Sequence, residues 1–301
     1  MSTTQPPVVI GLGELLWDDF PDGKRPGGAP ANVAFQANQL GCQGLMATRI
    51  GTDSEGDELL EVLAAKGLDL SVVQRDPEHA TGRVTVALNH GIPRYQIHEP
   101  AAWDFLELND PLRSASQRAA AICFGTLAQR TRISREAIHA AVSLASPDCL
   151  RVYDVNLRQN YYQSGWIRQS LRLANLVKLN DEEVRTLGPL LGLPEDEAEF
   201  ARNISSLFDP QIVCVTRGAR GCLIVTRTET HDIPGRPVKV ADTVGAGDAF
   251  TAGLIAAQLR NWPLALSGEF ANRVGGMVAA RQGAMPELRD EFAQLLEQYA
   301  P

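Results

Sequence analysis

Asp242-Thr243-Val244-Gly245-Ala246-Gly247-Asp248 connects an extended segment, Val238–Val240, to a long apolar run that has helical spacing. Small residues at the start of that helix let the backbone approach a ligand closely. The first N–H groups of a helix lack intrahelical partners, and the helix dipole makes that end positive. We therefore predict an anion-binding site formed by Gly245, Ala246 and Gly247.

Asp248 lies in the first turn of the same helix, beside the predicted anion. A carboxylate would repel a bound phosphoryl group, so its presence is best explained if it accepts the proton of an attacking hydroxyl. The alternative is a helix start at which the dipole alone favours Asp248. The full D-T-x-G-A-G-D string favours the catalytic interpretation. At a helix N-terminus this carboxylate is expected to stay ionised and to be a weak base.

A second glycine-rich string, Pro26-Gly27-Gly28-Ala29-Pro30-Ala31-Asn32-Val33-Ala34, precedes a helix near the N-terminus. Its paired glycines expose backbone, and the Asn32 side chain can both donate and accept hydrogen bonds, as sugar hydroxyls require. The alternative is an ordinary turn followed by a helix that begins near Pro30.

Composition excludes several classes of protein. The chain has 301 residues, 44% of them apolar, and 28 basic against 36 acidic residues, for a net charge of −8. No basic run indicates nucleic acid as a partner, and no apolar stretch reaches the ~18–20 residues of a membrane span. Five cysteines without a C-x-x-C pair indicate a reduced chain, with neither disulfides nor zinc. We therefore expect a cytoplasmic α/β protein with no membrane partner.

Periodicity divides the chain into two kinds of structure. Arg83–Asn89 alternates apolar and polar residues, and a turn at His90-Gly91 leads to Arg94–His98, so we predict a hairpin within a small antiparallel patch. The hairpin is either a lid over a site or an extension of a sheet edge. After residue 110, short apolar runs alternate with helical stretches, which predicts a parallel sheet with right-handed crossovers. The predicted strands are Val8–Gly13, Ala121–Phe124, Val152–Val155, Leu176–Leu179 and Ile212–Val215, and the predicted helices include Ala31–Leu40, Ser134–Leu144, Glu195–Leu207, Gly245–Leu259, Leu264–Arg281 and Leu288–Tyr299.

The two glycine-rich strings together resemble the ribokinase-like, or PfkB, family of carbohydrate kinases. Gly13-Glu14-Leu15-Leu16-Trp17-Asp18 is most similar to the bacterial fructokinase branch, and the resemblance runs from about Val8 to Pro286. It implies one domain over residues 1–301, with a Rossmann-type three-layer α/β/α body. It also implies a small β lid from about residues 14–26 and 82–108.

The family resemblance also implies the chemistry, which is transfer of the γ-phosphoryl group of ATP, with Mg²⁺, to a primary alcohol of a sugar. By position, Asp248 is then the base, and Gly245, Ala246 and Gly247 form the anion hole. The sugar ligands that it implies are Asp18, Gly27, Gly28 and Asn32.

Asn180-Asp181-Glu182-Glu183 resembles the family's N-x-x-E, which helps to organise hydrated Mg²⁺ near the triphosphate. From the residues alone, Asn180 and Glu183 also have the spacing of a capping box, and the two roles are compatible. Mg²⁺ keeps several waters and takes few protein ligands, so we expect Glu183 to act through water.

The remaining ATP residues are implied with weaker local signals. Thr216-Arg217-Gly218-Ala219-Arg220-Gly221 resembles the family's T-x-G-x-x-G turn under the nucleotide phosphates, although alone it indicates only a strand–turn–strand hairpin. Arg158, in D-x-N-x-R, is expected to neutralise phosphate charge. The ATP-binding residues implied in total are Thr216, Gly218, Gly221, Arg158, Asn180, Asn272 and Gly275. The turn Gly283-Ala284-Met285-Pro286 lacks the serine of a monovalent-cation site, which argues against activation by K⁺.

Fructose is the acceptor expected first. The alternatives are 2-keto-3-deoxygluconate, ribose or a nucleoside, and a non-catalytic sugar sensor on the same fold. A Rossmann dehydrogenase is excluded because Gly11-Leu12-Gly13-Glu14-Leu15-Leu16 lacks the third glycine of its fingerprint. A lid with one apolar face predicts a homodimer that forms through the lid.

Overall fold

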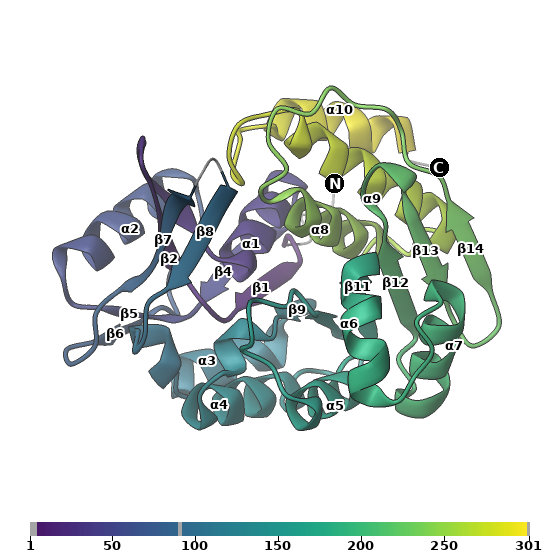
Figure 1. Ribbon diagram of the computed structural model, residues 1–301. Coiled ribbons are helices and arrows are strands. Elements are labelled where there is room, and N and C mark those ends of the chain that lie inside the picture. The colour runs from purple at the N-terminus through teal and green to yellow at the C-terminus, as the bar shows by residue number, and fades with distance from the viewer. Residues whose placement is uncertain (1–4, 90–91, 300–301) are drawn as a thin grey trace.

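The computed structural model describes residues 5–89 and 92–299, and a single large sheet runs through its centre (Figure 1). Six neighbouring strands pair in parallel and the last two are antiparallel, which confirms the predicted parallel sheet. The strand order is β14 (Thr230–Ile233), β13 (Cys222–Val225), β12 (Ile212–Thr216), β11 (Leu176–Asn180), β10 (Leu150–Asp154), β9 (Ala121–Phe124), β1 (Val8–Leu12) and β4 (Gln43–Ala47).

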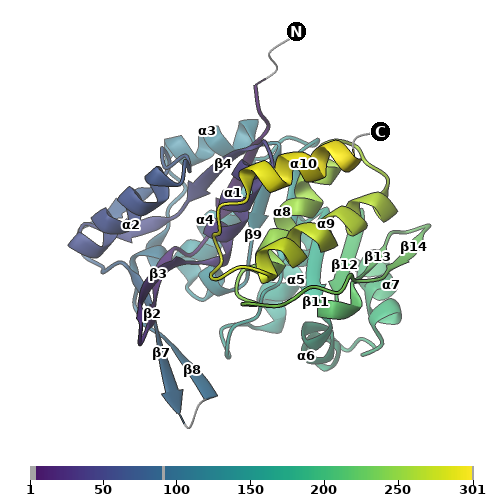
Figure 2. The same ribbon diagram turned by 90° about the horizontal axis from the view of Figure 1, so that it is seen from above.

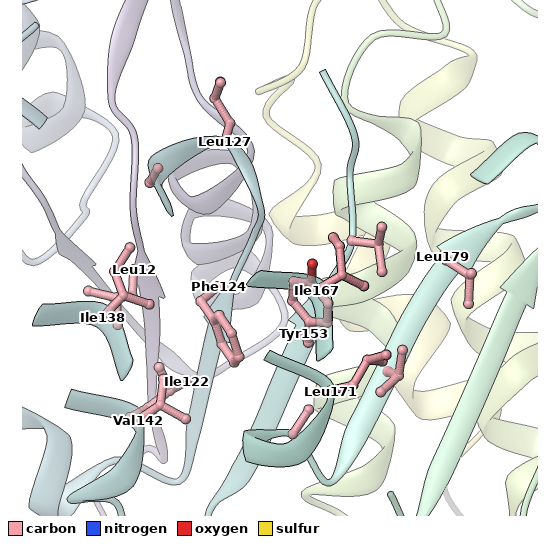
Figure 3. Close-up of a cluster of buried hydrophobic side chains, with 14 of the residues drawn as sticks. Leu12, Ile122, Phe124, Leu127, Ile138, Val142, Tyr153, Ile167, Leu171 and Leu179 are labelled. Atoms are coloured by element: carbon pink, nitrogen blue, oxygen red, sulfur yellow. The ribbon is translucent and has the colours of Figure 1, made fainter. Parts of the chain in front are cut away.

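Helices cover both faces of this sheet, as the two views show (Figure 2). Strand residues alternate between the faces, so Val9 and Ile10 belong to different apolar clusters. One cluster is covered by α3 (Asp110–Arg118), α4 (Arg132–Ser143), α5 (Ser164–Leu173), α6 (Asp181–Leu191) and α7 (Glu197–Phe208), and Figure 3 shows part of it. The other is covered by α1 (Ala29–Gln39), α8 (Ala246–Gln258), α9 (Leu264–Ala279) and α10 (Arg289–Tyr299). The three-layer α/β/α body is thereby confirmed.

A four-stranded sheet forms the predicted lid and projects from the body (Figure 2). Its order is β3 (Gly23–Gly27), β2 (Leu16–Phe20), β7 (Gly82–Asn89) and β8 (Ile92–Ile97). The strands of the predicted hairpin are therefore confirmed, and they form a separate sheet and do not extend the main one. The predicted turn at His90-Gly91 lies outside the described residues.

Two details of the lid differ from expectation. The patch is not purely antiparallel, because β2 and β7 pair in parallel, Leu16 opposite Gly82. Residues 98–108 contain no strand but a short 3₁₀ turn, η1 (Ala102–Phe105), which is packed by the buried Trp103. Outside the lid, the segment Val238–Val240, predicted to be extended, is assigned to no strand and is exposed.

The remaining elements are short or lie beside the lid. They are α2 (Ser54–Ala65), the two-stranded sheet of β5 (Arg49–Gly51) and β6 (Gln74–Asp76), and two further 3₁₀ turns, η2 (Leu127–Gln129) and η3 (Gly218–Arg220). Within residues 5–89 and 92–299, no helix combines the length and apolar character needed to cross a membrane. In the main sheet, β1 lies between β9 and β4, and connections leave it in both directions. A ligand crevice is expected outside the carboxyl ends of the strands at such a switch point.

Candidate active site

A cavity of about 880 Å³ occupies this crevice and extends beneath the lid. Its wall contains residues at or just after the carboxyl ends of β1, β10, β11 and β12, together with the start of α8. All predicted site residues line it except Gly27 and Glu183. The structure therefore brings together the two glycine-rich strings and the weaker ATP motifs, which are far apart in the sequence.

Gly245 shapes the turn that starts α8. Its φ of 76° is in the left-handed region, and a Cβ there would lie 2.6 Å from Ala284 Cα, so only glycine fits. The Ala246 N–H donates to Thr243 O at 3.2 Å. In the described part of the chain, the N–H groups of Gly245, Gly247 and Asp248 have no hydrogen-bond partner. These three amides are therefore available to bind an anion, whereas the predicted Ala246 N–H is engaged within the turn.

Asp248 and Asn32 are in direct contact. Asn32 Nδ2 donates to Asp248 Oδ2 at 2.7 Å, which joins α1 to α8. Burial raises the pKa of Asp248, and the nearby Asp154 carboxylate raises it further, while the bond from Asn32 lowers it. This upward shift is opposite to the weakly basic carboxylate expected from the sequence, because burial and Asp154 outweigh the groups that favour the ionised form. A more basic Asp248 is better suited to accept a proton.

A buried ion pair lies next to Asp248 and was not assigned from the sequence. Lys178 Nζ lies 3.1 Å from Asp154 Oδ1, and Thr251 Oγ1 donates to Asp154 Oδ2 at 2.7 Å. Burial lowers the pKa of Lys178, but Asp154, Glu183 and Asp248 together hold it above its ordinary value. Lys178 also lines the cavity and places a fixed positive charge there. A lysine inside the otherwise apolar strand β11 was the available sequence signal.

The lid end of the cavity holds two further carboxyl groups, Asp18 and Glu14. Burial raises the pKa of Asp18 to about 6, and Asp248 also raises it, whereas Arg158 lowers it. Gly27 lies behind Asp18 on the neighbouring strand, where a Cβ would be 2.2 Å from Asp18 Oδ2. Gly27 therefore makes room for the Asp18 carboxyl group, and it does not itself line the cavity. Gly28 does line it.

Apolar lid side chains cover this end. Leu16, Val84 and Ile97 come from three lid strands, are at most 8% exposed and all line the cavity. The opposite side of β2 and β7 contacts α2, through the buried Trp17, which donates to Glu55 O at 3.0 Å, and through the ion pair of Arg83 with Glu55. The lid residues described on the cavity side thus shield the acidic groups from water.

Asn180 and Glu183 form the capping box that their spacing allows. Asn180 Oδ1 accepts the Glu183 N–H at 2.8 Å, and Glu183 Oε2 accepts the Asn180 N–H at 2.8 Å. Glu183 Oε1 accepts the Leu157 N–H at 2.7 Å. Because both carboxylate oxygens are used and only Asn180 lines the cavity, the arrangement suits a water-mediated role of Glu183 toward a metal ion. No group of three or more His, Cys, Asp or Glu able to hold a metal occurs in the described residues.

The other end of the cavity is formed by β12, β13 and α9. The turn after Thr216 is the strand–turn–strand hairpin that its pattern indicates. Gly221 in this turn has a φ of 91°, and a Cβ there would lie 2.1 Å from Ile233 O, so the position requires glycine. Asn272 and Gly275 of α9 lie in the wall, and α9 packs so closely on α8 that a Gly275 Cβ would be 2.9 Å from Ala246 O. Arg158 is exposed and lies at the wall of the same cavity.

The loop before α8 and the late turn are tied together. Asp242 Oδ1 accepts the Val244 N–H and its Oδ2 accepts the Gly283 N–H, both at 3.0 Å. Asp242 thus fixes the two segments that would surround a monovalent cation. The turn at residues 283–286 contains no serine, and the expectation that K⁺ does not activate the protein stays a prediction.

Comparisons with known proteins agree with this geometry. Residues 20–290 match the pfkB family of carbohydrate kinases. Fructokinase of Escherichia coli is 30% identical over 92% of this chain and 94% of that protein. An uncharacterized sugar kinase of Pyrococcus horikoshii, solved with ATP, has a TM-score of 0.85 at 27% identity and covers 97% of this chain and 100% of its own. Fructokinase of Vibrio cholerae, solved with fructose, ADP and calcium, has a TM-score of 0.81 at 26% identity, with coverages of 96% and 99%.

The family match covers most of the chain and includes both glycine-rich strings and the lid strands β7 and β8. The likeness of fold extends to the body and the lid together. The resemblance inferred from the two strings is thereby confirmed. This chain belongs to the pfkB family of carbohydrate kinases and is an ATP-dependent sugar kinase, a phosphotransferase with an alcohol group as acceptor.

Proposed function

We propose that this kinase is a fructokinase, which phosphorylates a primary alcohol of fructose. The observation that carries the proposal is the Asn32–Asp248 contact at 2.7 Å, because it places a predicted sugar ligand against the predicted base. An alcohol bound by Asn32 lies within reach of the carboxylate that would deprotonate it. The fructokinases among the relatives support the choice of sugar.

The chemistry of the lid end supports an uncharged acceptor with many hydroxyls. Glu14, Asp18 and Asp248 all belong to this part of the wall, and Arg158 is the cation that acts on all three. Carboxyl and amide groups hydrogen-bond sugar hydroxyls well. An acceptor with its own carboxylate, such as 2-keto-3-deoxygluconate, would be repelled by this cluster, whereas fructose would not.

In the proposed reaction, Asp248 accepts the proton of the primary hydroxyl as its oxygen attacks the γ-phosphorus. The bond from that phosphorus to the bridging oxygen of ATP breaks, and ADP leaves. The free N–H groups of Gly245, Gly247 and Asp248 stabilise the charge on the transferring group. Lys178 adds a fixed positive charge nearby, and the lid limits hydrolysis by excluding water.

We propose Mg²⁺ as the metal that accompanies ATP. When bound with the nucleotide, Mg²⁺ neutralises negative charge on the β- and γ-phosphate oxygens. Of the residues present, Asn180 reaches the cavity wall and Glu183 lies directly behind it. Glu183 would hold the ion through water.

An ADP-release assay with a panel of acceptors tests the proposal: fructose, ribose, glucose, 2-keto-3-deoxygluconate and adenosine. Turnover with fructose at the highest kcat/KM is expected. Preferential turnover of another acceptor would overturn the choice of fructose but not the sugar kinase. The Asp248→Asn variant controls for contaminating kinases, because it should lose the signal.

A result with no turnover above background ATP hydrolysis would instead favour the sugar sensor. Calorimetry with each sugar then identifies the ligand, since a sensor binds its sugar without ADP release. The free anion hole and the Asn32–Asp248 contact favour the kinase, because a sensor needs neither.

We also propose that the protein is a cytoplasmic homodimer that forms through its lids. The described apolar residues Leu16, Val84 and Ile97 face the cavity, so pairing would use the rim and outer face of the lid. Sedimentation velocity at micromolar protein tests this assembly. A single monomeric species would overturn it.

A further inference from the structure

Glu14 is a buried cavity residue to which no sequence motif assigned a role. It lies two residues after the end of β1, is 4% exposed and lines the cavity. Its Oε2 atom is buried and has no hydrogen-bond partner within the described residues. Buried polar atoms in folded proteins are nearly always paired, so an unpaired one in a ligand cavity points to a partner that arrives with the ligand.

A second unpaired acceptor lies at the same end of the cavity. Asn32 is 5% exposed, and its Nδ2 is used by Asp248, but its Oδ1 has no partner in the described chain. Glu14 and α1 are in close contact, because a Cβ on Gly28 would lie 2.5 Å from Glu14 O. The two unpaired oxygens thus come from adjoining segments, and Asp248, which would receive the proton, contacts Asn32 and acts electrostatically on Glu14.

We propose that Glu14 is a further acceptor-binding residue, which together with Asn32 holds a hydroxyl of the sugar next to the hydroxyl that is phosphorylated. The inference rests on the proposed function as a sugar kinase and does not depend on which sugar is the acceptor. It predicts that Glu14 selects for that hydroxyl, because a site that hydrogen-bonds a hydroxyl rejects analogues that lack it.

The charge state of Glu14 determines how it can bind. Burial raises its pKa to about 7, Asp248 also raises it, and Arg158 and the N–H groups of Glu14 and Ala29 lower it. Asp18 on β2 is the other titratable group at this end, with a pKa of about 6. The neutral carboxyl group donates a proton, so a sugar hydroxyl can accept from Glu14 while it donates to Asn32 Oδ1.

Two variants separate binding from structure. Glu14→Leu removes the polar group, and it should raise the KM for the sugar about 10- to 100-fold with little change in the KM for ATP. Glu14→Gln keeps the shape and an N–H donor at every pH. It should therefore retain sugar affinity, and the rise of sugar KM with pH through about 7 in the native enzyme should become smaller.

Monodeoxy analogues of the acceptor provide the readout that a merely structural role would not change. In the native enzyme, each missing hydroxyl that the site binds lowers kcat/KM. In Glu14→Leu, the penalty for one of these analogues should disappear while the others remain. Penalties that are all unchanged in Glu14→Leu, or a sugar KM within about threefold of native, would overturn the inference.

Asp19→Asn is the matched control. Asp19 neighbours Asp18 on β2, does not line the cavity and lies 3.7 Å from Arg83. The sugar KM and the pH profile of the Asp19→Asn variant should be the same as in the native enzyme.

If Glu14→Leu fails to fold, the Glu14→Gln variant still tests the inference, because an unchanged pH dependence of its sugar KM would refute the role of Glu14. A native enzyme that phosphorylates no acceptor would overturn the proposed function as well, whereas active enzyme with unaffected Glu14 variants would overturn this inference alone.

Discussion

Asn32 and Asp248 are 216 residues apart in the chain and are joined by a hydrogen bond of 2.7 Å. Asn32 belongs to the helix that follows the Gly-Gly pair, and Asp248 to the helix that follows the Gly-Ala-Gly turn. The contact therefore joins the two glycine-rich strings at the cavity, where the proposed acceptor and phosphoryl groups would meet. It also lowers the pKa of the buried Asp248.

Replacing Asp248 with Asn should remove the proton acceptor and preserve the shape of the site. Loss of a general base costs about 10²- to 10⁴-fold in rate, so kcat should fall at least ~100-fold. The Kd values for sugar and ATP, measured by calorimetry, should stay within a few-fold of native. Retention of a third or more of native kcat would refute the assignment of the base. Asp19→Asn should remain fully active.

Replacing Asn32 with Ala should change the pH dependence of the reaction. Without the hydrogen bond from Asn32, the pKa of Asp248 rises, because that bond favours the ionised carboxylate. The acid limb of kcat/KM against pH should therefore move to higher pH, with a loss of about 10- to 100-fold at its plateau. An unmoved acid limb would show that Asp248 does not control it.

Replacing Gly27 with Ala should impair only the sugar side. The new Cβ would lie 2.2 Å from Asp18 Oδ2 and must displace that carboxyl group. Since small misplacements in a site cost up to about 100-fold, kcat/KM for the sugar should fall at least tenfold while the KM for ATP is unchanged. Gly165→Ala is the control, because a Cβ at Gly165 meets no atom within 4 Å. Equal losses in both variants would contradict the explanation.

Replacing Lys178 with Met should destabilise the protein strongly. Asp154 is 3% exposed and would lose its cationic partner, which for buried pairs costs roughly 3–5 kcal/mol. Chemical denaturation measures the free energy of unfolding. Lys66→Met removes a more exposed lysine paired with Glu287 and should cost about 0–1 kcal/mol. Similar values for the two variants would show that Asp154 is solvated or otherwise paired.

Glu14 should make the stability of the protein without ligands depend on pH. Its pKa rises from 4.5 in the unfolded chain to about 7 in the fold, so folding favours the neutral form. This contribution is fully present below pH 4.5 and is lost as the pH rises through about 7. We would measure the free energy of unfolding at pH 5 and at pH 8. Between these pH values, that of Glu14→Gln should rise relative to that of the native protein by roughly 3 kcal/mol. A difference that is independent of pH would mean that Glu14 titrates normally.

Local patterns in the sequence determined the body of the fold and the two strings of the site. Runs such as Ala121–Phe124 are apolar throughout because the strand is covered on both faces, and that requirement is visible in any buried parallel strand. The Gly-Ala-Gly turn is equally local, because a helix N-terminus exposes its amides whatever surrounds it. Asp248 and Asn32 could therefore be proposed as site residues from local patterns, and Asp18 from the family resemblance, before the cavity was known.

Only the tertiary structure decided how those residues behave and which others join them. The basicity of Asp248, on α8, depends on burial and on Asp154, at the end of β10. Gly27 matters through the space that it leaves for Asp18, and Glu14 through an oxygen with no partner among the described residues, and neither relationship can be seen in the sequence motifs that contain these residues. Desolvation, close approach and unpaired atoms arise between segments that are distant in the chain. Such properties exist only once the segments have packed together.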